Sequence, residues 1–270
     1  MTVWNKNEGD QTMAHTKEIL TLAVEIGDTM LRSGAEIYRV EDSLIHILES
    51  CEVDNFDVYV LSNGIFASAN EDQEDACSMI RHVPISSVNL SKVAALNQLV
   101  RDICDHKCSI AEATVRLTEC KHIPPYPKPV LVAGCAVACG CFCYLYGGTA
   151  IDMIFATCIG IVEQFFLFAC GKHHVSRFLT NVYASLVVAV LSILAFASGL
   201  PVHHDKIIIG DIMPLVPGIV FTTSIRDFYN SDYLSGTIHL IDALLTALCI
   251  AVGICLPIVL FRYLGGGLAL

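Results

Sequence analysis

Two prolines and a glycine interrupt an apolar stretch in the last third of the chain. Pro214 and Pro217 lack a backbone N–H donor, and Gly218 follows directly. Inside a bilayer such an interruption is tolerated only where protein covers it or where it lines a wet cavity. A half-helix that begins near Gly218 presents free amides and a positive dipole end, which suit a carboxylate, and Thr222 adds a hydroxyl. The alternative is a kinked structural helix.

Ionisable side chains within apolar stretches are the next candidates. A charge in hydrocarbon is costly and commonly marks a pathway or a proton relay. Glu163 and Asp211 are the clearest cases, and we expect one of them to carry a coupling proton. The alternative is a carboxylate that is hydrogen-bonded at a helix interface.

A basic residue and three acidic residues follow the interruption. Arg226 is placed to receive a carboxylate through two hydrogen bonds, or to pair with an acidic neighbour as a gate. The alternative for Arg226 is an interfacial anchor that obeys the positive-inside rule. The acidic residues are Asp227, Asp232 and Asp242.

Cysteines are numerous, and three of them stand two residues apart. Cys139, Cys141 and Cys143 invite a metal interpretation. On a helix, however, this spacing directs the side chains around the axis. We therefore predict small, polarizable packing residues, with no metal and no cofactor.

A hydrolase can be imagined from Asp42, Ser43 and His46 in the N-terminal half. The chain has no nucleophile elbow and no phosphate loop to support it. A solvated helix face with local ion pairs is the simpler interpretation.

The elements that position these residues follow from composition. The 270 residues are 54% hydrophobic and 16% charged, with a net charge of −11. Residues 1–129 hold 11 Lys/Arg and 20 Asp/Glu, whereas residues 130–270 hold only 5 and 7. The acidity argues against nucleic acid as a partner. We predict a small α+β cytoplasmic domain, 1–129, that ends in a Pro-rich linker, and an α-helical transmembrane domain, 130–270, solvated by the lipid bilayer.

Apolar stretches of spanning length, about 20 residues, divide the second domain. Five spans place the termini on opposite sides, and flanking Lys/Arg residues favour a cytoplasmic N-terminal domain. The fourth span contains the interruption, so we predict a five-span bundle with a broken fourth helix. If that span is re-entrant, the C-terminus returns to the cytoplasmic side. The predicted spans are 130–146, 151–170, 182–200, 207–225 and 243–261.

The N-terminal domain is predicted from periodicity. Apolar residues recur every three or four positions over 19–30 and again over 37–48, which predicts two helices. Between them, Ser33 and Glu36 have the spacing of a capping box for the second helix. Three strands are expected at 58–61, 65–69 and 77–83.

Two sequence runs together resemble the threonine/serine exporter (ThrE) family. The run 33–42, Ser-Gly-Ala-Glu-Ile-Tyr-Arg-Val-Glu-Asp, is similar to its N-terminal hallmark. The membrane signature is matched by residues 215–218, 224–227, 232, 235–236 and 242–245. The resemblance covers roughly residues 20–260. Asp242 stands where the family pattern usually has Glu.

The resemblance implies a secondary exporter of small carboxylate metabolites. Its substrates would be threonine and serine, or dicarboxylates such as succinate, and we expect proton coupling. With five spans, the chain is similar to the longer subunit of a split form that works with a small membrane protein of about 150 residues. Self-association is a further expectation, and the bacterial inner membrane is the expected location. The alternatives are a membrane-anchored sensor or scaffold, and a hydrolase acting through the cytoplasmic domain.

Overall fold

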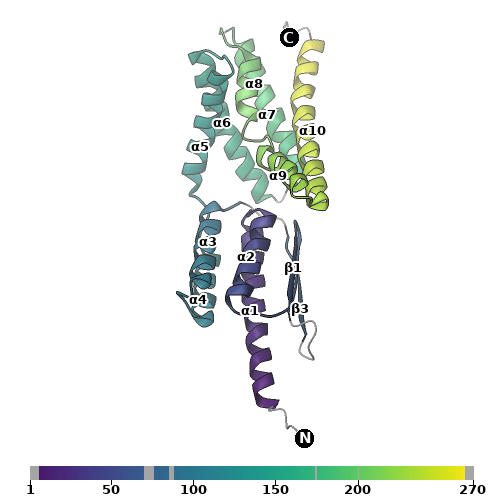
Figure 1. The fold of residues 1–270 in the computed structure, drawn as a ribbon. Helices are drawn as coiled ribbons and strands as arrows, with labels where there is room; N and C mark the ends of the chain where they lie inside the picture. Colours follow the sequence, from purple (N-terminus) through teal and green to yellow (C-terminus); the bar gives the residue numbers. More distant parts are fainter. Residues whose placement is uncertain (1–5, 70–75, 85–87, 174, 200, 265–270) are drawn as a thin grey trace. The chain divides into compact units, whose positions relative to one another are not determined.

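The computed structural model describes residues 6–69, 76–84, 88–173, 175–199 and 201–264, with side chains from residue 15 onward. The chain divides into two compact units, Met1–Pro125 and Tyr126–Leu270 (Figure 1). The first unit combines helices with a small sheet, and the second is helical.

The first unit contains an antiparallel sheet in the order β1-β2-β3. The pairing is regular, with Tyr59 opposite Phe66 and Phe66 opposite Ile80. A small α+β region is therefore present at the N-terminal end, and all three predicted strands occur. Its elements are α1 (Lys6–Arg32), α2 (Ile37–Ser50), β1 (Phe56–Leu61), β2 (Gly64–Ala69), β3 (Cys77–His82), α3 (Leu90–Cys104) and α4 (Ile110–Lys121).

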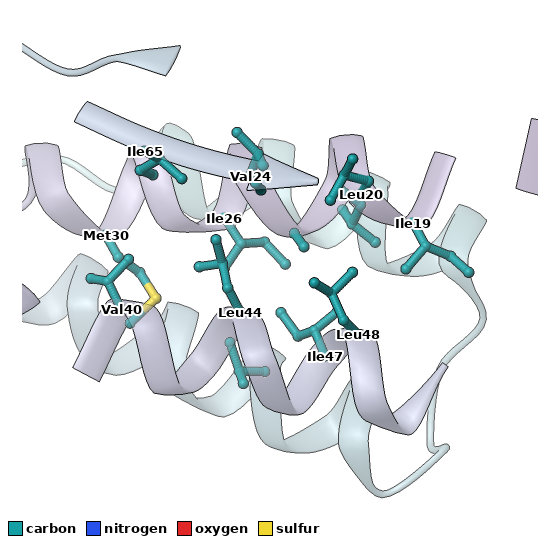
Figure 2. Close-up of a cluster of buried hydrophobic side chains, with 14 of the residues drawn as sticks. Ile19, Leu20, Val24, Ile26, Met30, Val40, Leu44, Ile47, Leu48 and Ile65 are labelled. Atoms are coloured by element: carbon teal, nitrogen blue, oxygen red, sulfur yellow. The ribbon is translucent and has the colours of Figure 1, made fainter. Parts of the chain in front are cut away.

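The core of this unit lies where α1, α2 and β2 meet (Figure 2). Ile26 from α1, Leu44 from α2 and Ile65 from β2 are all fully buried there. Gly27 lets α1 approach α2 closely, because a Cβ atom at this position would lie 2.7 Å from Leu44 Cδ1. The apolar faces of the two helices thus pack together in one continuous core.

The predicted capping box between α1 and α2 is wrong. Ser33 Oγ donates to Thr29 O at 2.7 Å, and Glu36 makes no side-chain cap. Gly34 has φ +85°, and the amides of Gly34 and Ala35 donate to Leu31 O and Met30 O. This pattern is a Schellman motif, so the Ser-Gly-Ala segment ends α1 instead of starting α2.

Four helices of the second unit are long and apolar enough to cross a membrane, among the residues described. The predicted fourth span, 207–225, is not one of them. It forms two short helices, α8 and α9, because Pro214 and Pro217 remove backbone donors between them. The helices are α5 (Lys128–Leu145), α6 (Ala150–Lys172), α7 (Arg177–Ala197), α8 (His204–Ile212), α9 (Gly218–Tyr229) and α10 (Tyr233–Tyr263).

Two polar contacts connect α8 and α10 to other helices of this unit. His203, just before α8, donates its backbone amide to Asp152 Oδ1 at 2.8 Å, at the start of α6. Asp242, in the first part of α10, accepts from Arg177 Nη1 at 3.0 Å, at the start of α7. Between these two contacts the chain forms the two short helices α8 and α9 and then the first part of α10 (Figure 1).

Candidate functional site

The centre of the helical unit holds two fully buried carboxyl groups. Glu163 on α6 and Asp211 on α8 both have 0% exposure. Cys139 Sγ lies 3.9 Å from Glu163 Oε2, and Cys135 Sγ lies 4.0 Å from Cys139 Sγ. Among the residues described, neither Asp211 oxygen has a hydrogen-bond partner, nor does Glu163 Oε1. Buried carboxyl oxygens without partners are energetically expensive, which makes this cluster a candidate site.

Glycines allow three helices to converge on Cys139. A Cβ atom at Gly160 of α6 would lie 2.7 Å from Cys139 Sγ. A Cβ atom at Gly210 of α8 would lie 2.7 Å from Cys139 O and 2.7 Å from Cys143 Cβ. Both helices therefore touch α5 closely, as small residues permit in membrane bundles. This close contact places Asp211, the residue after Gly210, beside the part of α5 that carries Cys139.

The segment between α8 and α9 inserts one buried side chain into the bundle. Leu215 is 8% exposed and packs with Ala184 of α7 and Ile250 of α10. Pro214 and Gly218 are exposed, and Pro217 is half-buried. The non-helical backbone thus passes next to the packed centre of the unit, beside α8 and its Asp211.

The hydroxyl predicted at Thr222 is used locally. Thr222 Oγ1 lies 3.0 Å from Gly218 O and 2.9 Å from Ile219 O, to which it donates. Ser224 Oγ similarly donates to Phe221 O at 2.8 Å. These hydroxyls satisfy carbonyls of α9, so the amides at the start of α9 are its clearer candidate donors.

The acidic residues after the interruption make separate contacts. Asp227 is 4% exposed, and its Oδ2 lies 2.8 Å from His239 Nδ1. Asp232 caps α10 by accepting from the Ser235 amide at 3.1 Å. Asp242 pairs with Arg177, as described above. The contacts of Asp227 and Asp242 connect α9 to α10 and α10 to α7, and the contact of Asp232 is the N-cap of α10 itself. Arg226 is exposed on α9.

The predicted site residues therefore fall into three groups. Glu163 and Asp211 are together in the buried centre, and Pro214, Pro217, Gly218 and Thr222 lie in or next to the interruption. Arg226, Asp227, Asp232 and Asp242 lie on α9, at its end or in the first part of α10. Sequence reasoning missed Cys135, His239 and Arg177. Only Cys135 left a signal, since Cys135 and Cys139 stand four residues apart on one helix face.

The residues of the hydrolase interpretation make only local contacts among those described. Ser43 Oγ donates to Arg39 O at 2.7 Å, within α2. His46 Nδ1 lies 3.9 Å from Asp42 Oδ1, and both side chains are more than half exposed. These contacts are typical of a solvated helix face.

Titratable groups in the first unit have structural roles. Arg116 Nη2 donates to Asp102 Oδ2 at 2.6 Å, which lowers the pKa of Asp102 and links α4 to α3. Burial raises the pKa of the Cys51, Cys104 and Cys120 thiols. Thiols with raised pKa values stay protonated and are poor nucleophiles, as expected of packing residues.

Comparison with known proteins connects this arrangement to transport. The chain is 24% identical over 248 residues to a "Probable threonine/serine exporter" of Mycobacterium tuberculosis, covering 89% of this chain and 46% of the relative. It is 20% identical over 256 residues to the "Probable succinate transporter subunit YjjP" of Klebsiella aerogenes, covering 92% of this chain and 96% of the relative. The chain thus spans about half of the first relative and nearly all of the second.

No solved structure matches the chain. The family model described as "Putative threonine/serine exporter" matches residues 21–261, which include both units and all three groups of candidate residues. The chain therefore belongs to the ThrE family of threonine/serine exporters.

Proposed function

We propose that this chain is a subunit of a secondary exporter of small carboxylate metabolites. The observation that carries the proposal is the pair of buried carboxyl groups, Glu163 and Asp211, on two helices of the apolar unit. Asp211 lies on α8, directly before the helical interruption. Buried ionisable groups beside interrupted helices are typical of transport sites in membranes.

The path of α8 and α9 supports a crossing in two pieces. The contacts of His203 with Asp152 and of Asp242 with Arg177 lie at opposite ends of α6. In this proposal, α8 and α9 form one further crossing in addition to the four long helices. The crossing is interrupted, which explains why the described residues between α7 and α10 form no single helix of spanning length. In this proposal, the amides at the start of α9 receive the substrate carboxylate, and Arg226 guides it at one end of the unit.

We assign the coupling of export to cation movement to the buried centre of the helical unit. We expect the coupling cation, a proton in the sequence-based hypothesis, to bind at Glu163 and Asp211. Substrate class follows the family and its named relatives, which divide between threonine/serine and succinate. Both kinds of substrate carry the carboxylate that a helix N-terminus can bind.

A second subunit is part of the proposal. The chain covers 46% of the Mycobacterium tuberculosis relative, and the Klebsiella aerogenes relative is named a subunit. A site shared between two half-bundles would be incomplete in this chain. We therefore expect a small membrane protein of the same family to complete it, in the inner membrane, with the N-terminal unit in the cytoplasm.

The test is flux through vesicles that contain the chain with and without its small subunit. Labelled serine and labelled succinate are offered side by side under an imposed proton gradient. We expect one of them to move only when both subunits are present. Full transport by the chain alone would contradict the split arrangement, and no transport of either substrate would contradict the function.

Two substitutions connect the flux to the buried carboxyl groups. Glu163→Gln and Asp211→Asn should each reduce gradient-driven flux to background, because the coupling cation loses its binding group. Asp205→Asn is the matched control, since Asp205 lies on the same helix as Asp211 with a side chain that is 54% exposed. Unchanged flux in Glu163→Gln would remove this residue from the mechanism. A sensor or scaffold would show no flux in any variant.

A further inference from the structure

The buried centre contains sulfur ligands as well as carboxyl groups. Cys135 and Cys139 lie four residues apart on α5, so both thiols face the same side of the helix. The two sulfur atoms and a Glu163 carboxyl oxygen all lie within 4.8 Å of one another. Cys135 is 8% exposed, and Cys139 and Glu163 are fully buried.

These separations are close to those of a metal site. A tetrahedral Zn²⁺ with Zn–S bonds of about 2.3 Å and Zn–O bonds of about 2.1 Å separates its ligand atoms by roughly 3.5–3.8 Å. Here the two sulfur atoms are 4.0 Å apart, and Cys139 Sγ is 3.9 Å from Glu163 Oε2. The third separation, from Cys135 Sγ to a Glu163 carboxyl oxygen, is within 4.8 Å, so shifts of up to roughly 1 Å would bring the three ligand atoms to coordination geometry.

The unpartnered oxygens point to an occupant of positive charge. Both Asp211 oxygens and Glu163 Oε1 are buried without hydrogen-bond partners among the residues described. Asp211 is placed beside the same cluster, because Gly210, the residue before it, lies so close to α5 that a Cβ atom there would be 2.7 Å from Cys139 O. A cation bound between the thiolates and carboxylates would satisfy these atoms and offset the cost of their burial.

We propose that Cys135, Cys139 and Glu163, completed by Asp211, bind a thiophilic divalent cation of the Zn²⁺ class. Two sulfur ligands select such a cation over Mg²⁺ or Ca²⁺, which prefer oxygen. Gly160 and Gly210 are part of the site, because they let α6 and α8 reach the sulfur-bearing face of α5. The metal occupies Glu163 and Asp211 and therefore arrests export, and this last step alone rests on the proposed function.

Cadmium is a direct probe of the sulfur ligands. The full chain, purified in detergent and freed of metal, is titrated with Cd²⁺ while the ultraviolet absorption of cadmium–thiolate bonds is recorded. We expect one component of this absorption to disappear in Cys135→Ser and in Cys139→Ser. Cys141→Ser is the matched control, because Cys141 lies on the same helix but is exposed. Equal absorption in Cys139→Ser and Cys141→Ser would overturn the proposal.

Thermal unfolding gives a second and independent readout. Zn²⁺ should raise the melting temperature of the wild-type chain and of Cys141→Ser, because the metal binds the folded state. The rise should be lost in Cys139→Ser and in Glu163→Gln. If Cys139→Ser does not fold, Cys135→Ser and Glu163→Gln decide the question. A zinc-dependent rise of equal size in both of these variants would contradict the site.

Neither readout needs substrate or a gradient. If the wild-type chain binds no metal but still transports serine or succinate, only this inference is removed. Metal binding without flux would remove only the proposed function. If Zn²⁺ inhibits flux through the wild-type pair of subunits but not through the pair that contains Cys139→Ser, the metal site is connected to export.

Discussion

Asp102 and Arg116 form a charge pair whose contribution to stability depends on pH. Arg116 lowers the pKa of Asp102 through a 2.6 Å hydrogen bond between α4 and α3. The unfolded chain has the ordinary Asp value of about 3.9, so the folded state binds this proton more weakly. The pair therefore stabilises the fold fully above about pH 3.9, and the contribution is lost as pH falls through the lower pKa of the folded state.

Replacement of Arg116 by Met should reveal this dependence. At pH 6 we expect Arg116→Met to lower the melting temperature of the N-terminal unit in the full chain. At pH 2–3 the difference from the wild type should shrink, because Asp102 is then increasingly protonated in both proteins. Lys107→Met is the control, since its partner Asp105 and Lys107 are both more than half exposed. An Arg116→Met effect of the same size at both pH values would contradict the assignment.

At the residue scale, the sequence identifies ionisable groups in apolar stretches better than it identifies the residues that contact carboxyl groups. Glu163 and Asp211 could be identified because a charge in an apolar stretch is rare for physical reasons. His239 and Arg177 could not, since they lie 12 and 65 residues from the carboxyl groups they contact. Such pairs depend on how helices pack, which neither periodicity nor composition encodes.

At the scale of elements, the packing of α8 should be sensitive to side-chain volume on the face that contacts α5. A Cβ atom at Gly210 would lie 2.7 Å from Cys139 O, a backbone atom that cannot turn away. Gly210→Ala should therefore push α8 from α5 and destabilise the helical unit by about 1–3 kcal/mol, the usual cost of overpacking. Chemical or thermal unfolding of the purified chain measures this change.

Gly218→Ala is the matched control on α9. A Cβ atom at Gly218 meets nothing within 4 Å, so we expect stability equal to or slightly above that of the wild type. Similar losses in Gly210→Ala and Gly218→Ala would show that α8 does not touch α5 as described. A larger side chain in Gly218→Leu should leave the fold intact and reduce flux, because it covers the N-terminal end of α9.

Helices and strands were predictable where apolar spacing is regular, but their ends were not. The periodicity over 19–30 and 37–48 correctly predicts α1 and α2, whereas the spacing of Ser33 and Glu36 predicts a cap for the wrong helix. The Schellman motif depends on the positive φ of Gly34, which sequence spacing alone does not reveal. Similarly, Pro214 and Pro217 predicted an interruption, but apolar content alone merged α8 and α9 into one span of 207–225.

At the scale of the whole molecule, the number of crossings fixes the sides of the termini. If α8 and α9 together cross the membrane beside the four long helices, the chain crosses five times and its ends lie on opposite sides. If they do not, both ends lie on the same side. We expect opposite sides, with the N-terminus in the cytoplasm. Reporter domains fused before Met1 and after Leu270, each active on one side only, measure this directly, and activity of both on one side would contradict it.

The short helices α8 and α9 also constrain how the protein enters its membrane during synthesis. With 9 and 12 residues, each is shorter than the roughly 20 needed to leave a translocation channel alone. The next helix, α10, contains an 18-residue window with a mean hydropathy of 2.8, the highest among the four candidate spans. We therefore expect α8 and α9 to insert into the bilayer only after α10 has been synthesised, and together with it. Asp211 would then reach hydrocarbon only when α5 and α6 are already there to receive it.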